Sequence, residues 1–73
     1  MIDDIQETTG AVHAFIRRYC AQNGLPPSQR EIGAACYLSQ PGVIRHLDRL
    51  AMQGKIERIP GKSRGIRLLD DQD

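Results

Sequence analysis

Two short helices in immediate succession are the feature that most constrains the fold of this chain. Ser28 and Glu31 match the capping box, in which the serine hydroxyl accepts from the backbone N–H three residues on and the glutamate reaches back to the serine N–H. Ser39 begins the second helix, and Gly54 ends it, since glycine readily adopts the left-handed conformation. Only about one or two residues around Leu38 separate the two helices, so we expect a sharp turn and crossed packing.

An earlier helix precedes this pair, and its start and end are also marked. Its apolar stripe, at steps of three, four and seven residues, consists of Ile5, Val12, Phe15, Ile16 and Tyr19. We expect Asp3, Asp4 or Thr8 to cap its start. Asn23 and Gly24 stop it, and the Pro26-Pro27 pair prevents it from resuming.

The crossed helices are expected to bury one face each. In the helix from 29 to 36 or 37, the buried set is Ile32, Ala35 and Cys36. In the helix that opens at Ser39 and runs to Gly54, it is Val43, Leu47, Leu50 and Ala51.

After Gly54 the apolar period changes from 3.6 to 2, which predicts a β-hairpin with strands at 55–59 and 65–69. Residues 60–64 form its basic turn. The predicted fold is therefore mainly α with a small β-hairpin, a winged helix-turn-helix of three helices and a two-stranded wing. We expect one domain over residues 1–73, in which 70–73 form an acidic tail or the start of a linker.

Charge is distributed unevenly along the chain. The formal net charge is only +1, but all ten lysines and arginines lie between Arg17 and Arg67, against three acids there, a local net charge of +7. Such asymmetry is typical of a phosphate-binding face.

Several other classes of protein are disfavoured. No apolar run approaches the roughly 20 residues of a membrane span, and the start is acidic where a signal peptide is basic. Cys20 and Cys36 are interpreted as buried free thiols of a cytoplasmic protein. His13 and His46 belong to different helices and show no ligand spacing with the cysteines, so we expect no catalytic site, no metal and no cofactor.

Double-stranded DNA is the expected partner, with the helix that opens at Ser39 in the major groove. Gln40 can make two hydrogen bonds to adenine and Arg45 two to guanine, while Pro41 and Ile44 suit a thymine methyl. The complete set expected on this helix is Ser39, Gln40, Pro41, Gly42, Ile44, Arg45, His46 and Arg49. Phosphate contacts are expected from Ser28 and Gln29 at a helix start and from Lys62, Ser63 and Arg64 in the wing.

Specific residue combinations resemble a known family. The runs 24–28 (Gly-Leu-Pro-Pro-Ser), 30–32 (Arg-Glu-Ile) and 63–69 (Ser-Arg-Gly-Ile-Arg-Leu-Leu), at this separation, are similar to the DNA-binding domain of the LexA repressors. The resemblance covers nearly the whole chain and implies a winged helix-turn-helix that binds operator DNA as a repressor. It departs at 38–42, which is shorter than in the family and more similar to ArsR or MarR repressors.

LexA repressors also carry a C-terminal peptidase domain, which contains a self-cleaving Ser–Lys pair and forms the dimer. Nothing in these 73 residues can supply that domain. This chain is therefore expected to be either a free-standing relative or the N-terminal piece of a longer protein. Tight binding by so small a module requires two copies on a palindromic operator. Two alternatives remain at this point: a winged helix used for protein–protein contact, which Ile44 and Met52 would serve, and a small phage or plasmid DNA-binding factor.

Overall fold

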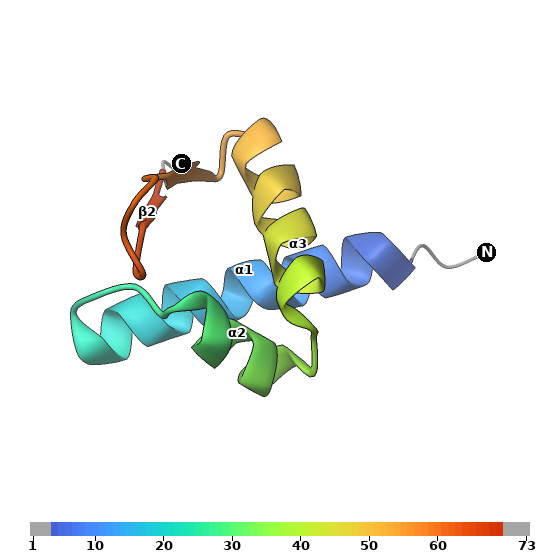
Figure 1. Ribbon diagram of the computed structural model, residues 1–73, viewed down its shortest axis with the longest axis horizontal. Helices are drawn as coiled ribbons and strands as arrows, with labels where there is room; N and C mark the ends of the chain where they lie inside the picture. The colour runs from blue at the N-terminus through green and yellow to red at the C-terminus, as the bar shows by residue number, and fades with distance from the viewer. Residues whose placement is uncertain (1–3, 70–73) are drawn as a thin grey trace.

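A computed structural model of the chain describes residues 4–69. Three helices, α1 (Asp4–Asn23), α2 (Gln29–Cys36) and α3 (Gln40–Met52), precede two strands, β1 (Ile56–Arg58) and β2 (Ile66–Leu68). α2 and α3 both pack on α1, and the hairpin follows α3 (Figure 1). This arrangement confirms the expected mainly helical fold with a two-stranded wing. The proposed acidic tail at 70–73 lies outside the described residues.

The core lies where the three helices and the hairpin meet. Its buried apolar side chains come from every element: Val12, Ile16, Ile32, Val43, Leu47, Leu50, Ile56 and Ile66. Val12 and Ile16 of the expected α1 stripe and Val43, Leu47 and Leu50 of the expected α3 stripe therefore face inward. Ala35 was expected in the core but is exposed, and Cys36 is only half-buried, because α2 is short and only Ile32 of its side chains is fully covered.

Helix boundaries follow the capping signals in the sequence. At α2, the Glu31 N–H donates to Ser28 Oγ at 3.1 Å and the Ser28 N–H donates to Glu31 Oε1 at 2.8 Å, which confirms the capping box. At α3, Ser39 Oγ accepts from the Gly42 N–H at 3.3 Å, and Pro41 occupies the first turn. α1 begins at Asp4, so Thr8 lies inside the helix and does not cap it.

Gly54 ends α3 as predicted. Its φ of +76° is left-handed, its N–H donates to the Ala51 carbonyl at 3.0 Å, and the Lys55 N–H donates to the Leu50 carbonyl at 3.0 Å. These two bonds form a Schellman motif, which satisfies carbonyls at the helix end and turns the chain into β1.

The turn between α2 and α3 is tighter than its residue types suggest. Tyr37 takes a left-handed φ of 58°, although it is neither glycine nor asparagine, and its side chain is 93% exposed. The Leu38 N–H then donates to the Gly33 carbonyl at 2.9 Å. A Cβ at Gly33 would lie 2.8 Å from the Leu38 carbonyl oxygen, so the absence of a side chain there permits the turn to fold back on α2.

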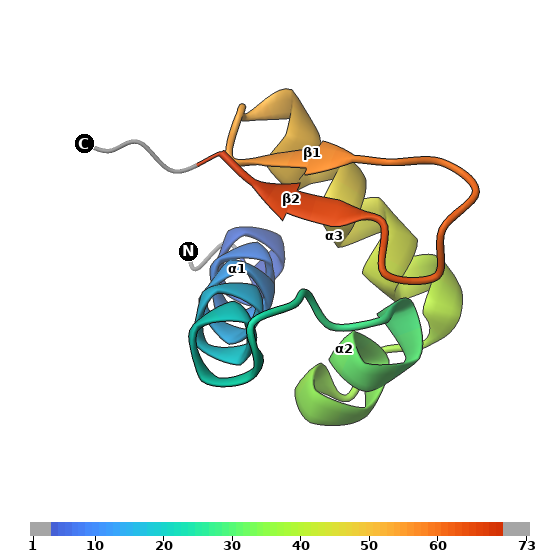
Figure 2. The ribbon, with the colours of Figure 1, turned by 90° about the vertical axis from the view of Figure 1, so that its left-hand side faces the viewer.

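The hairpin is antiparallel and short. Glu57 pairs with Arg67 in the register, and the two side chains form an ion pair of 3.1 Å. The next residue, Arg58, points to the opposite face of the strand and donates to Asp48 of α3 at 2.6 Å. The loop at 59–65 reaches toward the start of α2 (Figure 2).

None of the described helices is long and apolar enough to cross a membrane. Cys20 and Cys36 are free thiols, both half-buried, and burial raises the pKa of each.

Candidate DNA interface

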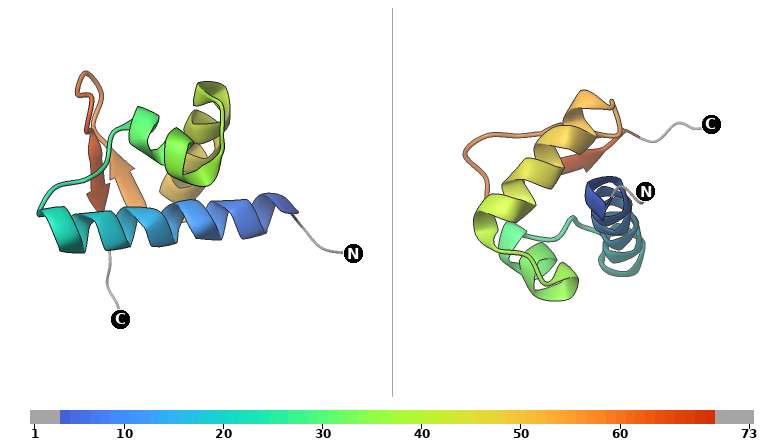
Figure 3. Two further views of the ribbon diagram at one scale, coloured as in Figure 1. Left: turned by 90° about the horizontal axis from the view of Figure 1, so that it is seen from below. Right: turned by 90° about the vertical axis from the view of Figure 1, so that its right-hand side faces the viewer.

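One side of α3 remains outside the core. Gln40, Pro41, Ile44 and Arg45 are exposed there, as the helical pattern predicted, and 36% of Ile44 is accessible to solvent. The start of α3, α2 and the wing loop project from the side of the molecule opposite α1 (Figure 3). The start of α3, α2 and the wing loop therefore place the polar residues expected to contact DNA on one edge of the molecule.

The starts of α2 and α3 are joined by a hydrogen bond between two amides. Gln40 Nε2 donates to Gln29 Oε1 at 3.3 Å. This bond uses one of the two N–H groups of Gln40 and leaves its second N–H and its oxygen available. The positive ends of two helix dipoles consequently lie close together on the exposed edge.

An open groove separates the wing from the two helix starts. Lys62 and Ser63 on the wing and Gln29 and Arg30 on α2 line it, with Gln40 at its α3 end. Lys62, Ser63 and Arg30 are exposed. Arg30 was not among the residues expected to contact DNA, although its position two residues after the capping Ser28 places it in the first turn of α2. Both walls of the groove thus carry a cation.

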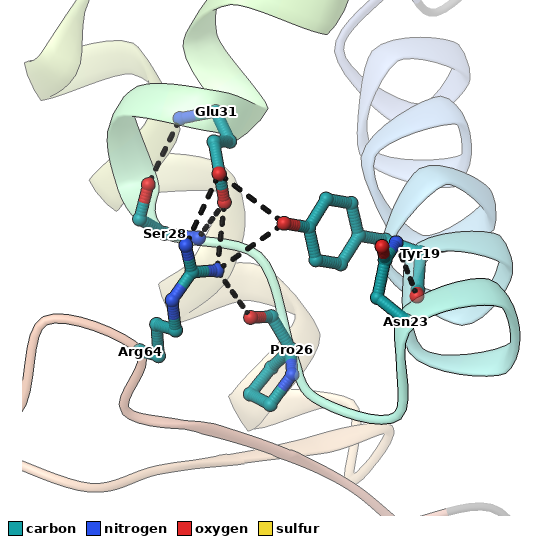
Figure 4. A network of polar contacts seen from close by, with 6 residues as sticks. All are labelled: Tyr19, Asn23, Pro26, Ser28, Glu31 and Arg64. Atoms are coloured by element: carbon teal, nitrogen blue, oxygen red, sulfur yellow. Dashed lines mark hydrogen bonds and ion pairs between the residues drawn. The ribbon is translucent and has the colours of Figure 1, made fainter.

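Arg64 does not project from the wing tip. Its Nη1 donates to Glu31 Oε1 at 2.8 Å and to the Pro26 carbonyl at 2.8 Å, and its Nη2 donates to Glu31 Oε2 at 3.1 Å (Figure 4). Tyr19 OH donates to Glu31 Oε2 at 3.2 Å, and the Arg64 guanidinium lies 5.9 Å from the Tyr19 ring centroid. These contacts direct the two Nη groups of Arg64 to Glu31 and Pro26, although its side chain remains 39% exposed. The phosphate contact expected from Arg64 stays a prediction.

The Arg64 contacts also shift the proton equilibrium of Glu31. Hydrogen bonds from Arg64, and then from the Ser28 backbone, lower the pKa of Glu31 to about 2. The same pairing raises the pKa of Arg64. Both groups are therefore charged throughout the neutral range.

His46 and Arg49 were expected among the DNA-contacting residues of this helix, but neither is freely exposed. His46 is 7% exposed, and its Nδ1 lies 2.8 Å from Thr9 Oγ1 of α1. Arg49 is half-buried, with a buried Nε. His46 follows Val43 by three residues and precedes Leu50 by four, so the helical repeat turns it toward α1; this signal was present in the sequence.

Gly42 is half-buried at the start of α3. A Cβ there would lie 3.4 Å from Ser39 Oγ and 3.7 Å from the Leu38 Cβ. Its nearest neighbours thus belong to its own helix start.

Comparison with known proteins agrees with this geometry. A family model described as the LexA DNA binding domain matches residues 5–65, which include α2, α3 and most of the wing. The chain belongs to the LexA DNA-binding domain family. Within a LexA domain, the groove between α2, α3 and the wing is the candidate interface. The resemblance of the chain to this family is confirmed.

Individual proteins named LexA repressor are similar to this chain. The chain is 45% identical over 64 residues to the LexA repressor of Brevibacillus brevis, covering 86% of this chain and 31% of the relative. It is 46% identical over 59 residues to the LexA repressor of Syntrophomonas wolfei, covering 80% and 29%, and 40% identical over 63 residues to that of Providencia rettgeri, covering 85% and 31%. The chain thus spans about a third of the length of these LexA repressors.

The described part of the LexA domain contains no group of three or more histidine, cysteine or acidic side chains that could hold a metal ion.

Proposed function

We propose that this LexA domain binds double-stranded DNA in a sequence-specific manner and acts as a transcriptional repressor, with α3 in the major groove. The observation that carries the proposal is the exposed α3 face, which lies on the same edge as the cationic groove between α2 and the wing. A helix in the major groove beside neighbouring phosphate contacts is the docking geometry of helix-turn-helix proteins. The names of the relatives support the repressor role.

Base recognition falls to the exposed residues of α3. The Arg45 side chain can donate twice to guanine, and Gln40 can donate to N7 and accept from N6 of adenine with the two polar sites that Gln29 leaves available. Each good bidentate pair contributes about 1–3 kcal/mol of discrimination against the wrong base. Pro41 and Ile44, both exposed, offer apolar contact to a thymine methyl.

Phosphates are assigned to the helix starts and the wing. Ser28, Gln29 and Ser39 lie at or next to N-termini whose amides attract anions, and Gly42 allows the backbone there to approach closely. Lys62 and Ser63 approach from the wing, and Arg30 from α2. With about six phosphates contacted, the logarithm of affinity falls with the logarithm of salt concentration at a slope of about −5.

His46, Arg49 and Arg64 are not part of the proposed contact set. His46 Nδ1 faces Thr9, the Arg49 Nε is buried, and the Arg64 guanidinium is paired with Glu31. We also propose that residues 1–73 act as one domain without catalytic activity or cofactor, in the cytoplasm, where the DNA lies. A single module makes few base contacts, so operator binding is proposed to use two copies on a palindromic site.

Selection from a random duplex library, followed by a salt titration on the best site, tests this function. An enriched palindrome and a steep salt slope support it, and the half-site spacing then reports the arrangement of the two copies. No enrichment with weak, salt-insensitive binding would contradict it and favour the protein–protein role, for which 36% exposed Ile44 and 90% exposed Met52 are candidate contacts.

A further inference from the structure

The Arg64 network joins three elements that are distant in sequence. Arg64 comes from the wing, Glu31 from the first turn of α2 and Tyr19 from α1, and the Pro26 carbonyl lies in the segment between the two helices (Figure 4). The Arg64 to Glu31 contact spans 33 residues. In the described part of the chain, this is the polar cluster in which α1, α2 and the wing all take part.

Its geometry differs from that of an ordinary surface ion pair. Isolated exposed pairs contribute little to stability, whereas bidentate arginine–carboxylate pairs within a network are held in one geometry. Here both Glu31 oxygens accept from the guanidinium, and the two side chains are only 39% and 38% exposed. Glu31 Oε1 also accepts from the Ser28 N–H, so the carboxylate that receives Arg64 is itself fixed by the start of α2.

The position of Arg64 also determines where the two preceding wing residues lie. Lys62 and Ser63 precede Arg64 directly and line the groove opposite Gln29 and Arg30. Behind Arg64, Gly65 is buried and its carbonyl accepts from the Ile59 N–H at 2.8 Å, which closes the base of the loop. The loop is therefore tied at its base by the backbone and near its tip by Arg64.

We infer that Arg64 is a positioning residue for DNA binding: paired with Glu31, it holds the wing at the start of α2, so that Lys62 and Ser63 already face the groove before DNA arrives. This inference rests on the proposed function. It assigns a role to Glu31, an acidic side chain beside a surface that binds a polyanion. Because the wing is held in advance, binding does not have to order it.

The inference predicts that Glu31→Gln weakens DNA binding, whereas simple electrostatics predicts that the same change strengthens it. If Arg64 contacted a phosphate, removing the nearby negative charge in Glu31→Gln would strengthen DNA binding. If Arg64 acts through Glu31, the same change releases the wing and weakens binding, with an expected loss of about threefold to tenfold in affinity. Glutamine keeps the capping box, so α2 retains its start.

Glu57→Gln is the matched control. Glu57 is an exposed wing carboxylate that pairs with Arg67 at 3.1 Å and takes no part in the Arg64 network. Its removal changes the net charge by the same amount, and we expect an unchanged or slightly higher affinity. Circular dichroism of each variant checks that the helices are intact.

A second readout needs no DNA. Trypsin cleaves after Lys62 when the wing loop opens, and cleavage after Lys55 in the same digest serves as the internal reference. We expect Glu31→Gln and Arg64→Met to cleave severalfold faster at Lys62, and the double variant to cleave no faster than either single variant.

The outcomes separate the two proposals. Weaker DNA binding and faster cleavage in Glu31→Gln support the positioning role. An affinity equal to or above that of the unaltered chain, or an unchanged cleavage rate, overturns it. Failure of the unaltered chain to bind any duplex overturns the proposed function, and the trypsin digest then still decides whether Glu31 holds the wing.

Discussion

Thr9 of α1 and His46 of α3 are joined by a buried hydrogen bond, with 2.8 Å between Thr9 Oγ1 and His46 Nδ1. Burial, and then the charges of Arg49 and Arg45, lower the pKa of His46 below its usual 6.5. Arg45 and Arg49 flank this histidine on its own helix, while Thr9 faces it from α1. The neutral imidazole is thus the form that the helix interface favours.

A first prediction concerns the pH dependence of stability near neutrality. Because the pKa of His46 is lower in the folded than in the unfolded state, the unfolded chain binds more protons as the pH falls below about 6.5. The free energy of unfolding should therefore decrease between pH 7.5 and 5.5, which urea denaturation at each pH measures. His46→Gln should flatten this dependence, and a control variant, His13→Gln, should keep it. An equal slope in His46→Gln would rule out His46 as the source.

A second prediction concerns acid. The pKa of Glu31 is depressed to about 2 from 4.5, so its contribution to stability is present above about pH 4.5 and is lost as the pH falls toward 2. Thermal melts should show a steeper fall in Tm over this window for the unaltered chain than for Glu31→Gln. The control Glu57→Gln should follow the unaltered chain. Parallel curves for all three would contradict the assignment.

The local features of the fold were predictable from the sequence. The capping box at Ser28 and Glu31, the Ser39 cap and the left-handed Gly54 each depend on residues within about five positions of one another. The periods of 3.6 and 2 likewise located the helices and the wing. These signals depend only on residues that are close in the sequence, so they can be recognised without knowing the tertiary structure.

The remaining features depend on distant partners. The sequence predicted Arg64 as a DNA ligand at the wing tip. A hairpin pattern cannot show that the Arg64 guanidinium pairs with Glu31, which lies 33 residues away in the sequence. The contact of His46 with Thr9 spans 37 residues, although its helical position already pointed inward. The exposure of Ala35 follows from how α2 sits on its neighbours, which periodicity in eight residues does not determine.

A third prediction tests the turn between α2 and α3. Tyr37 adopts a left-handed φ of 58° while its side chain is 93% exposed, so its backbone is strained and its ring contributes little packing. We expect Tyr37→Gly to be more stable than Tyr37→Ala by about 1 kcal/mol, the reverse of their order inside a helix. Urea denaturation of the two variants measures the difference. If alanine proved the more stable, the left-handed conformation of residue 37 would be wrong.

A fourth prediction addresses sequence recognition by α3. Arg45→Ala should weaken binding to the selected duplex by about 1–3 kcal/mol and relax the preference at one base position. Repeating the library selection with the variant locates that position. Arg67→Ala, which removes an arginine paired with Glu57 on the wing, should keep the preference. Loss of preference at no position would remove Arg45 from the recognition set.

A fifth prediction separates phosphate contact from base recognition. Lys62 is exposed in the wing loop at the cationic groove, and a phosphate ligand contributes affinity without sequence information. Lys62→Ala should therefore weaken all duplexes alike and reduce the magnitude of the salt slope by about one. Lys55→Ala is the control, since Lys55 is also exposed but lies before β1, at the end of the wing away from the loop, and should leave the slope unchanged. A Lys62 variant with an unaltered slope would place the wing away from the DNA backbone, because each lost phosphate contact must release one fewer counterion.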